Sequence, residues 1–102
     1  MKQRTTYYIG LRSPVAGNMP TDIAARRTLA LDSLADSYNA LTVTDVLGMW
    51  EGVEEPSIKV EVIEPRTIEN EERARLLART LREDLNQDAI GLTFEPVTFE
   101  LI

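Results

Sequence analysis

Four stretches of the chain alternate between apolar and polar residues, which is the pattern of strands that bury one face. They cover residues 4–11, 41–50, 57–64 and 90–94. In the first stretch Tyr7 and Ile9 share one face, and Tyr8 lies on the other. In the second, Asp45 falls on the more apolar face and Trp50 on the less apolar one. We therefore expect four strands, with Tyr8 and Trp50 on the less covered side of the sheet.

Two segments repeat apolar residues at steps of three and four, which predicts amphipathic helices. The first follows Pro20, where the hydroxyl of Thr21 can cap it, and extends to about Asn39. Its apolar stripe consists of Ala24, Leu31, Leu34, Ala35 and Tyr38. The second helix is capped by Thr67 or Asn70, and its stripe consists of Ala74, Leu77, Ala78, Leu81 and Leu85. Each helix therefore has one face that can cover a sheet.

The glycines and prolines mark the connections between these elements. Residues 12–20 form a loop, which we expect to be a mobile connection rather than a cover over a site. The segment 50–57, WEGVEEPS, is too long for a two-residue turn, so we expect a protruding loop or an extension of the hairpin. Pro96 interrupts the last alternation, which then resumes shifted by one residue. A bulge, a bend or a join between two short strands is expected there.

The order strand, helix, strand, strand, helix, strand is that of the split βαβ or ferredoxin-like plait. We expect an α+β fold in a single domain, residues 1–102, with two helices on one face of a four-stranded antiparallel sheet. The other face of the sheet stays open. An open face that carries aromatic residues favours a homodimer or a higher homo-oligomer, and a plait swapped between subunits is the second option.

Composition narrows the chemistry that the chain can perform. It has no cysteine and no histidine, which excludes thiolate nucleophiles and cysteine-type zinc sites and removes the commonest general base. Seventeen acidic residues against eleven basic ones give a net charge of -6, which argues against binding to a nucleic-acid backbone. No apolar run reaches the roughly 20 residues of a membrane span, and no apolar leader is present. We expect a cytoplasmic protein that does not enter a membrane.

The run Gly48, Met49, Trp50, Glu51, Gly52, followed by Glu55-Pro56-Ser57 and an alternating strand, resembles the second hairpin of a family of short, uncharacterised bacterial plait proteins. This resemblance covers the hairpin alone and implies a fold without an activity. The overall plan is also similar to that of the trimeric signalling and metal-tolerance plaits. The chain lacks the glycine-rich nucleotide loop of the signalling proteins, so their ligand is not implied.

Six residues stand out as candidates for a functional site. Trp50, with Met49 and Glu51 beside it, can anchor a partner or ligand, although a lone tryptophan can equally fold back over the core. Tyr8 and Arg12 can bind an anion or stack on a base. The weak catalytic candidates are Asp45, Glu51 and Tyr8, as carboxylate or phenol acids and bases.

The acidic group Glu51, Glu54 and Glu55, with Asp45 nearby, has the oxygen ligands that Mg²⁺ or Ca²⁺ use, but its spacing matches no calcium loop. We therefore expect no metal and no cofactor. The leading functional hypothesis is a non-enzymatic, oligomeric binding module that engages a partner protein or a small ligand. Such a chain would suit a phage or mobile-element accessory protein that sequesters a small molecule. The alternative is a small plait enzyme, isomerase-like or hydrolytic, that uses the three catalytic candidates.

Overall fold

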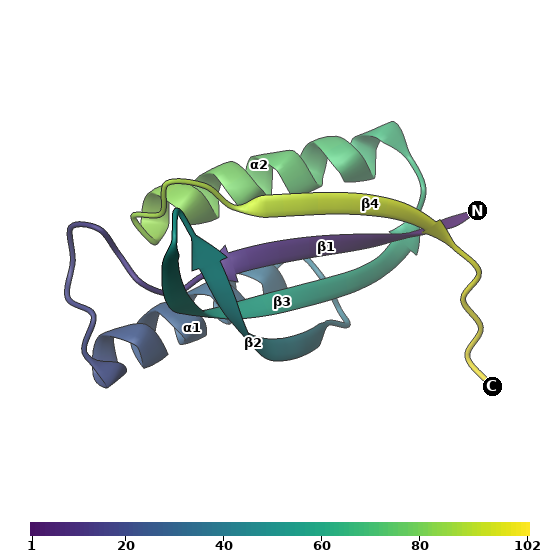
Figure 1. Cartoon of the computed structure of the whole chain (residues 1–102). Coiled ribbons are helices and arrows are strands. Elements are labelled where there is room, and N and C mark those ends of the chain that lie inside the picture. Colours follow the sequence, from purple (N-terminus) through teal and green to yellow (C-terminus); the bar gives the residue numbers. More distant parts are fainter.

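The computed structural model describes residues 1–102 and has the expected α+β fold. Its elements in chain order are β1 (Lys2–Gly10), α1 (Pro20–Ala35), β2 (Thr42–Trp50), β3 (Val53–Pro65), α2 (Ile68–Asp84) and β4 (Gly91–Val97). The strands form one antiparallel sheet in the order β2-β3-β1-β4. Both helices lie behind the sheet in Figure 1, so one face is covered and the other is open. The ferredoxin-like plait is confirmed. Neither helix is long and apolar enough to cross a membrane.

The core lies between the helices and the sheet, as the strand alternation predicts. Its fully buried side chains include Tyr7 and Ile9 of β1 and Ile58 and Val60 of β3. The predicted stripe of α2 is confirmed, because Ala74, Ala78, Leu81 and Leu85 are buried and Leu77 packs against them. The predicted stripe of α1 is partly wrong. Leu31, Leu34 and Tyr38 face the core as predicted, but Ala24 and Ala35 are exposed, and the helix also buries Ala30 and packs Ile23 against the core.

The two helices begin differently. Thr67 caps α2 as predicted, since its Oγ1 accepts a hydrogen bond from the Asn70 amide at 3.1 Å. Thr21 does not cap α1, because the helix already begins at Pro20. Asp22 closes that end instead by accepting a hydrogen bond from the Met19 amide at 2.9 Å. A proline needs no amide partner at the first helical position, which lets the helix start earlier than predicted.

The β2–β3 hairpin closes with a two-residue turn, so the prediction that segment 50–57 is too long for one is wrong. Trp50 pairs with Val53, and only Glu51 and Gly52 lie between the strands. Both have positive φ, 50° and 80°, as a type I′ turn requires. The rest of the segment lengthens the hairpin, which was the other option. Glu51 is an unusual residue for the left-handed conformation, so the sequence did not suggest this turn.

The last strand also differs from its prediction. β4 passes through Pro96 without a bulge, and its register against β1 is continuous from Gly91, opposite Tyr8, to Val97, opposite Lys2. Pro96 is tolerated because β4 is an edge strand, where a missing N–H on the free side breaks no sheet hydrogen bond. The chain leaves the sheet after Val97 and continues as an exposed tail beside the N-terminus (Figure 1).

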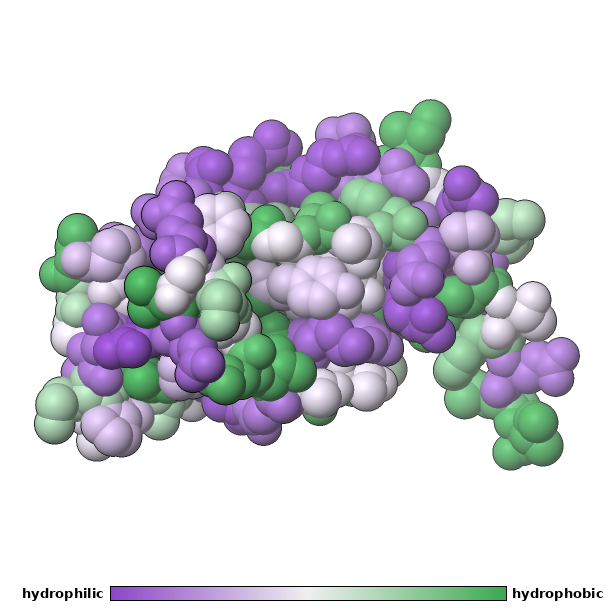
Figure 2. Space-filling view, in the orientation of Figure 1, coloured by the Kyte–Doolittle hydropathy of each residue, from purple (hydrophilic) through white to green (hydrophobic).

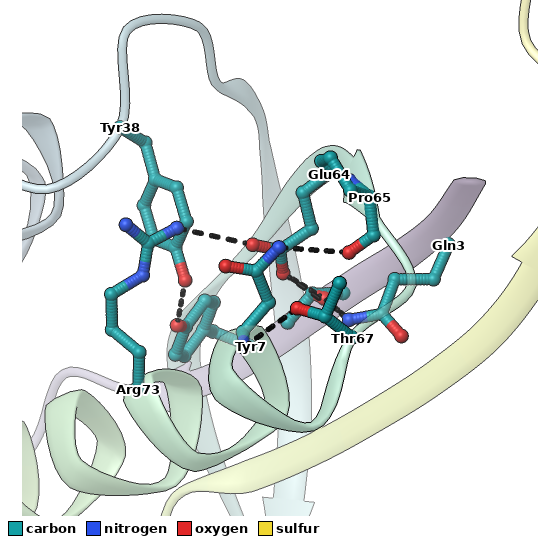
Figure 3. Close-up of polar contacts among 9 residues, drawn as sticks. Gln3, Tyr7, Tyr38, Glu64, Pro65, Thr67 and Arg73 are labelled. Carbon is teal, nitrogen blue, oxygen red and sulfur yellow. Dashed lines mark hydrogen bonds and ion pairs between the residues drawn. The ribbon is translucent and has the colours of Figure 1, made fainter. Parts of the chain in front are cut away.

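A network of buried polar side chains lies on the helix-covered side of the sheet, and no sequence pattern predicted it (Figure 3). Glu64 of β3, 4% exposed, accepts hydrogen bonds from Thr5 at 2.5 Å, Gln3 at 3.4 Å and Arg73 at 3.2 Å. A buried carboxylate is stable only when its oxygens are hydrogen-bonded in this way. The network therefore ties β1, β3 and α2 together at one end of the core.

The hydroxyl oxygens of Tyr7 and Tyr38 are 2.6 Å apart and share a hydrogen bond beside this network. The guanidinium of Arg73 lies 4.8 Å from the centre of the Tyr38 ring. Burial raises the pKa of both tyrosines, and the hydrogen bond to Tyr38 raises that of Tyr7 further. Both phenols therefore stay protonated in the folded protein at pH values where the unfolded chain ionises them.

Stability should therefore fall in alkaline solution because of Tyr7. Below the unfolded pKa of about 10, tyrosine is protonated in both states and the free energy of unfolding does not depend on its ionisation. Above that pH the unfolded chain loses the proton while the folded protein keeps it, so the free energy of unfolding falls progressively. The variant Tyr7→Phe should be about 1 kcal/mol less stable at pH 8, yet lose less stability than the native chain between pH 9 and pH 12. Urea unfolding at a series of pH values measures this difference, and parallel pH profiles would contradict the role given to Tyr7.

Candidate functional site

A cavity of about 750 Å³ opens at the end of the sheet where the β2–β3 hairpin curls beyond β1. Its floor is the open face of β1, β3 and β4. One wall is the hairpin, and the others are the loop after β1 and the connection between α2 and β4. Pockets that bind small molecules usually measure about 300–1,000 Å³. Figure 2 shows this face, where apolar side chains over the hairpin lie among polar ones.

Three strand glycines at the floor of the cavity lie so close to neighbouring side chains that a Cβ would not fit there. A Cβ on Gly91 would lie 3.0 Å from the Cβ of Tyr8, which is its partner across β1 and β4. A Cβ on Gly10 would collide with the carboxylate of Glu55, and one on Gly48 would lie 2.8 Å from the Oγ of Ser57. Without these side chains, Tyr8 and Glu55 can lie close over the sheet.

All five residues predicted to bind a ligand or partner line this one cavity: Trp50, Met49, Glu51, Tyr8 and Arg12. Trp50 is 49% exposed and Tyr8 is 45% exposed, so about half of the surface of each lining residue is accessible. Trp50 is therefore neither buried in the core nor fully in solvent. Whether these residues bind anything stays a prediction.

Asp45 lies outside the cavity, on the helix-covered side of β2. Its two carboxylate oxygens accept hydrogen bonds from Nε and an Nη of Arg27 at 2.8 and 3.1 Å. This bidentate contact holds the pKa of Asp45 below its usual value. An exposed carboxylate already paired with a guanidinium is poorly suited to act as a general acid or base, so Asp45 is not part of the candidate site.

The charge of the cavity is mainly negative. Its charged side chains are the acidic Glu51, Glu55 and Asp88 and the single basic residue Arg12. Glu55 is fixed by the Arg12 backbone amide, which donates to it at 3.3 Å. No group of three or more acidic side chains lies close enough to hold a metal ion. The arrangement favours a positively charged organic ligand over an anion.

The loop of residues 11–19 is held in place, which differs from the mobile connection predicted for it. Arg26 of α1 donates to the carbonyl oxygens of Leu11 at 2.6 Å and Gly17 at 2.5 Å, and to Asn18 Oδ1 at 2.8 Å. Asn18 Oδ1 also accepts a hydrogen bond from the Ser13 amide at 2.8 Å. Gln87 donates to the Arg12 carbonyl, so two walls of the cavity are joined. The loop therefore forms one wall of the cavity, and whether the cavity is a functional site stays a prediction.

Loss of the Arg26 side chain should loosen this wall without unfolding the protein. In Arg26→Gln we expect faster hydrogen exchange at the amides of Val15 and Ala16, which bond within the loop to Ser13. Any ligand of the cavity should bind about 5- to 10-fold more weakly, because the wall must be ordered on binding. Arg27→Gln is the matched control, since Arg27 contacts Asp45 and not the loop. Equal exchange rates in both variants would contradict this role of Arg26.

Several lining residues were not predicted, among them Glu55 as a ligand contact, Ser57, Gln87 and Asp88. Glu55 had been grouped with Glu51 and Glu54 as a metal candidate. The sequence did contain one signal for the place of the cavity, namely glycines within the predicted strands. An isolated glycine in a strand often marks a position that another group approaches closely. Gly10, Gly48 and Gly91 are such residues.

The sequence matches no protein-family model and no curated protein. Among solved structures, the chain is similar to a phage SAM lyase without ligand, with TM-score 0.66 and 17% identity over 91% of this chain and 78% of that one. A phage SAM lyase in complex with S-methyl-5'-thioadenosine gives TM-score 0.60 and 14% identity over 92% and 80%. A DUF3240 family protein from Shewanella baltica gives TM-score 0.65 and 8% identity over 98% and 94%.

At these identities the likeness establishes the fold alone. The neighbours include an enzyme from a phage and a DUF3240 family protein. The DUF3240 family protein shares the fold expected from the resemblance to uncharacterised bacterial plait proteins. No comparison connects the hairpin sequence GMWEG with the DUF3240 family.

Proposed function

We propose that the chain binds a small, positively charged nucleoside of the S-adenosylmethionine (SAM) type in the hairpin cavity. The observation that carries this proposal is the combination, in one cavity of about 750 Å³, of two half-exposed aromatic rings with three carboxylates. Of the two kinds of partner expected from the sequence, a small molecule fits a concave site better than a protein does.

The aromatic residues suit the base of such a ligand. Stacking a base on an aromatic side chain contributes about 1–3 kcal/mol and needs no hydrogen bond to the base. Tyr8 offers a ring that Gly91 allows to lie close to the sheet, and Trp50 offers one from the hairpin. The amide of Gln87 lies in the same lining and can bond to ring nitrogens or ribose hydroxyls, whereas the amide of Asn18 is already bonded to Ser13 and Arg26.

The charges suit the rest of the ligand. SAM carries a sulfonium and an ammonium group and one carboxylate, so it is a net cation. Glu51, Glu55 and Asp88 can attract the two positive groups, and Arg12 can pair with the ligand carboxylate. A cation is also attracted to the face of a tryptophan ring, which Trp50 supplies.

The structural neighbours support this ligand class, since one of them is a phage SAM lyase bound to S-methyl-5'-thioadenosine. The proposed role is sequestration, in which a phage or mobile-element protein lowers the free concentration of a host metabolite by binding it. The alternative is an enzyme that cleaves SAM, which the named activity of the neighbour favours. Glu55 would then replace Asp45 as the carboxylate of interest, because Asp45 is occupied by Arg27.

Isothermal titration with SAM, S-methyl-5'-thioadenosine and adenosine tests the proposal. Binding should be tightest for SAM, because only SAM carries the positive charges. Glu55→Gln should weaken SAM binding about tenfold and change adenosine binding little. No detectable binding of any of the three at millimolar concentration would contradict the proposal. Mass spectrometry of the same mixtures separates the two roles. Sequestration leaves SAM intact, whereas an enzyme breaks the bond between the sulfonium and Cγ and releases S-methyl-5'-thioadenosine together with the four-carbon amino-acid fragment, as the lactone when the SAM carboxylate attacks Cγ.

A further inference from the structure

The strand β2 has a free edge with none of the features that usually protect one. It is one of two edge strands, because the sheet order is β2-β3-β1-β4. Its nine residues, TVTDVLGMW, include no lysine, arginine or proline. Its only charged residue, Asp45, is paired with Arg27. Exposed strand edges in soluble proteins are normally blocked by charges, proline or bulges, because unpaired N–H and C=O groups recruit another strand.

The opposite edge is different. β4 carries Glu95 and Pro96 in its seven residues, and the missing N–H of a proline interrupts strand pairing. The two edges of the sheet are therefore not equivalent, and β2 is the one suited to pair with another strand.

The hairpin adds an exposed apolar surface to the β2 edge. β1 pairs with β3 only as far as Ser57, so residues 47–56 form a two-stranded ribbon beyond the sheet. Such a ribbon is marginally stable on its own. Leu47 and Met49 share the face of the ribbon opposite Val46 and Trp50, each is 67% exposed, and of the two only Met49 reaches the lining of the cavity. The cavity accounts for one face of the ribbon, and within this chain nothing covers the other.

We propose that β2 pairs antiparallel with β2 of a second copy of this chain, about a two-fold axis at Gly48. In this register Leu47 of one copy lies directly opposite Met49 of the other, and Val46 lies opposite Trp50. The two pairs nearest the axis are then apolar, and the axis passes through a residue without a side chain. An isologous contact of this kind requires a surface that is complementary to itself, and the segment Val46-Leu47-Gly48-Met49-Trp50 meets that requirement.

The pairing also joins the two cavities. Val46 and Trp50 both line the cavity of their own copy. In the pair, Val46 of one copy lies beside Trp50 of the other. Trp50 of one copy therefore borders the cavity of the other. Glu51 falls opposite Asp45, whose charge Arg27 already balances. The net charge of -6 on each copy opposes association, so the pair should tighten as salt is added.

Sedimentation of the free protein tests the surface, and needs no ligand, so the result does not depend on the proposed function. The native chain should be a dimer at about 100 μM, and Leu47→Lys should raise the dimer dissociation constant about a hundredfold. Leu76→Lys is the matched control, because Leu76 is 61% exposed on α2 and far from β2 in the fold. A native monomer, a trimer, or a dimer that Leu47→Lys leaves unchanged would overturn the proposal.

Cysteine cross-linking tests the register, and the chain has no native cysteine to interfere. Residues directly opposite in an antiparallel pair have Cα atoms about 4.5–5.5 Å apart, which a disulfide can span, whereas diagonal neighbours are about 7–8 Å apart. A mixture of Leu47→Cys and Met49→Cys should therefore form a mixed disulfide on oxidation, and each variant alone should cross-link far less. Efficient cross-linking of Leu47→Cys alone would refute a two-fold axis at Gly48.

Discussion

Replacing Glu64 with alanine is expected to lower the free energy of unfolding by about 2–4 kcal/mol, a large part of the stability of a chain this size. The side chain is 5% exposed and accepts hydrogen bonds from Thr5, Gln3 and Arg73. Its removal leaves the buried Thr5 hydroxyl without its acceptor, leaves Gln3 Nε2 bonded only to Thr5 Oγ1, and opens a small void. Gln3 Oε1 is already buried without a partner, so each further lost hydrogen bond adds to the unsatisfied polar atoms at this end of the core.

Glu61→Ala is the matched control for that measurement. Glu61 lies on the same strand but on the open face, where its carboxylate pairs with Arg4 at 3.6 Å and Lys59 at 3.1 Å. Ion pairs near the surface contribute about 0–1 kcal/mol, so this variant should lose less than 1 kcal/mol. Urea unfolding followed by circular dichroism measures both. Equal losses for the two variants would contradict the structural role of the buried network.

Replacing Trp50 with alanine is expected to weaken SAM binding by about 10- to 100-fold, because a stacked aromatic contact contributes roughly 1–3 kcal/mol. The unfolding free energy should change by less than about 1 kcal/mol, since the ring is 49% exposed and lies over the cavity rather than in the core. This combination of a large effect on affinity and a small one on stability distinguishes a ligand contact from a residue that covers the core.

Leu76→Ala is the control for that variant, because Leu76 is an exposed apolar residue of α2 outside the cavity. It should leave SAM affinity unchanged within about twofold. Titration calorimetry and urea unfolding on the three proteins give both quantities. A Trp50→Ala protein that binds SAM normally, or one that loses several kcal/mol of stability, would show that the ring does not act as proposed.

The fold could be predicted from the sequence because its signals are local. The alternation in β1 and the apolar stripe of α2 each specify an element and the face that it buries. The stripe of α1 was harder to assign, because alanines such as Ala24 and Ala30 are apolar enough for either side of a helix. The turn at Glu51 and Gly52 was missed because a glutamate rarely adopts a positive φ.

The candidate site was only partly predictable. The aromatic and charged residues of the hairpin and β1 stood out by type, and the structure places Trp50 and Tyr8 in one cavity. Glu55 and Gln87 could not be assigned to it without the strand register and the path of the loops. Glu64 was missed for another reason. It continues the buried face of Ile58 and Val60, and an acid at the end of a strand is usually solvated, so only its hydrogen-bond partners reveal that it is buried.

The most direct measurement of the central claim is NMR chemical-shift mapping of the ¹⁵N-labelled protein during titration with SAM. The account predicts that the largest amide shifts fall on residues that line the cavity, including Tyr8, Trp50 and Glu55, together with the indole N–H of Trp50. Amides on the outer face of α2, such as that of Leu76, should not move. No shifts at millimolar SAM, or shifts centred away from the cavity, would contradict it.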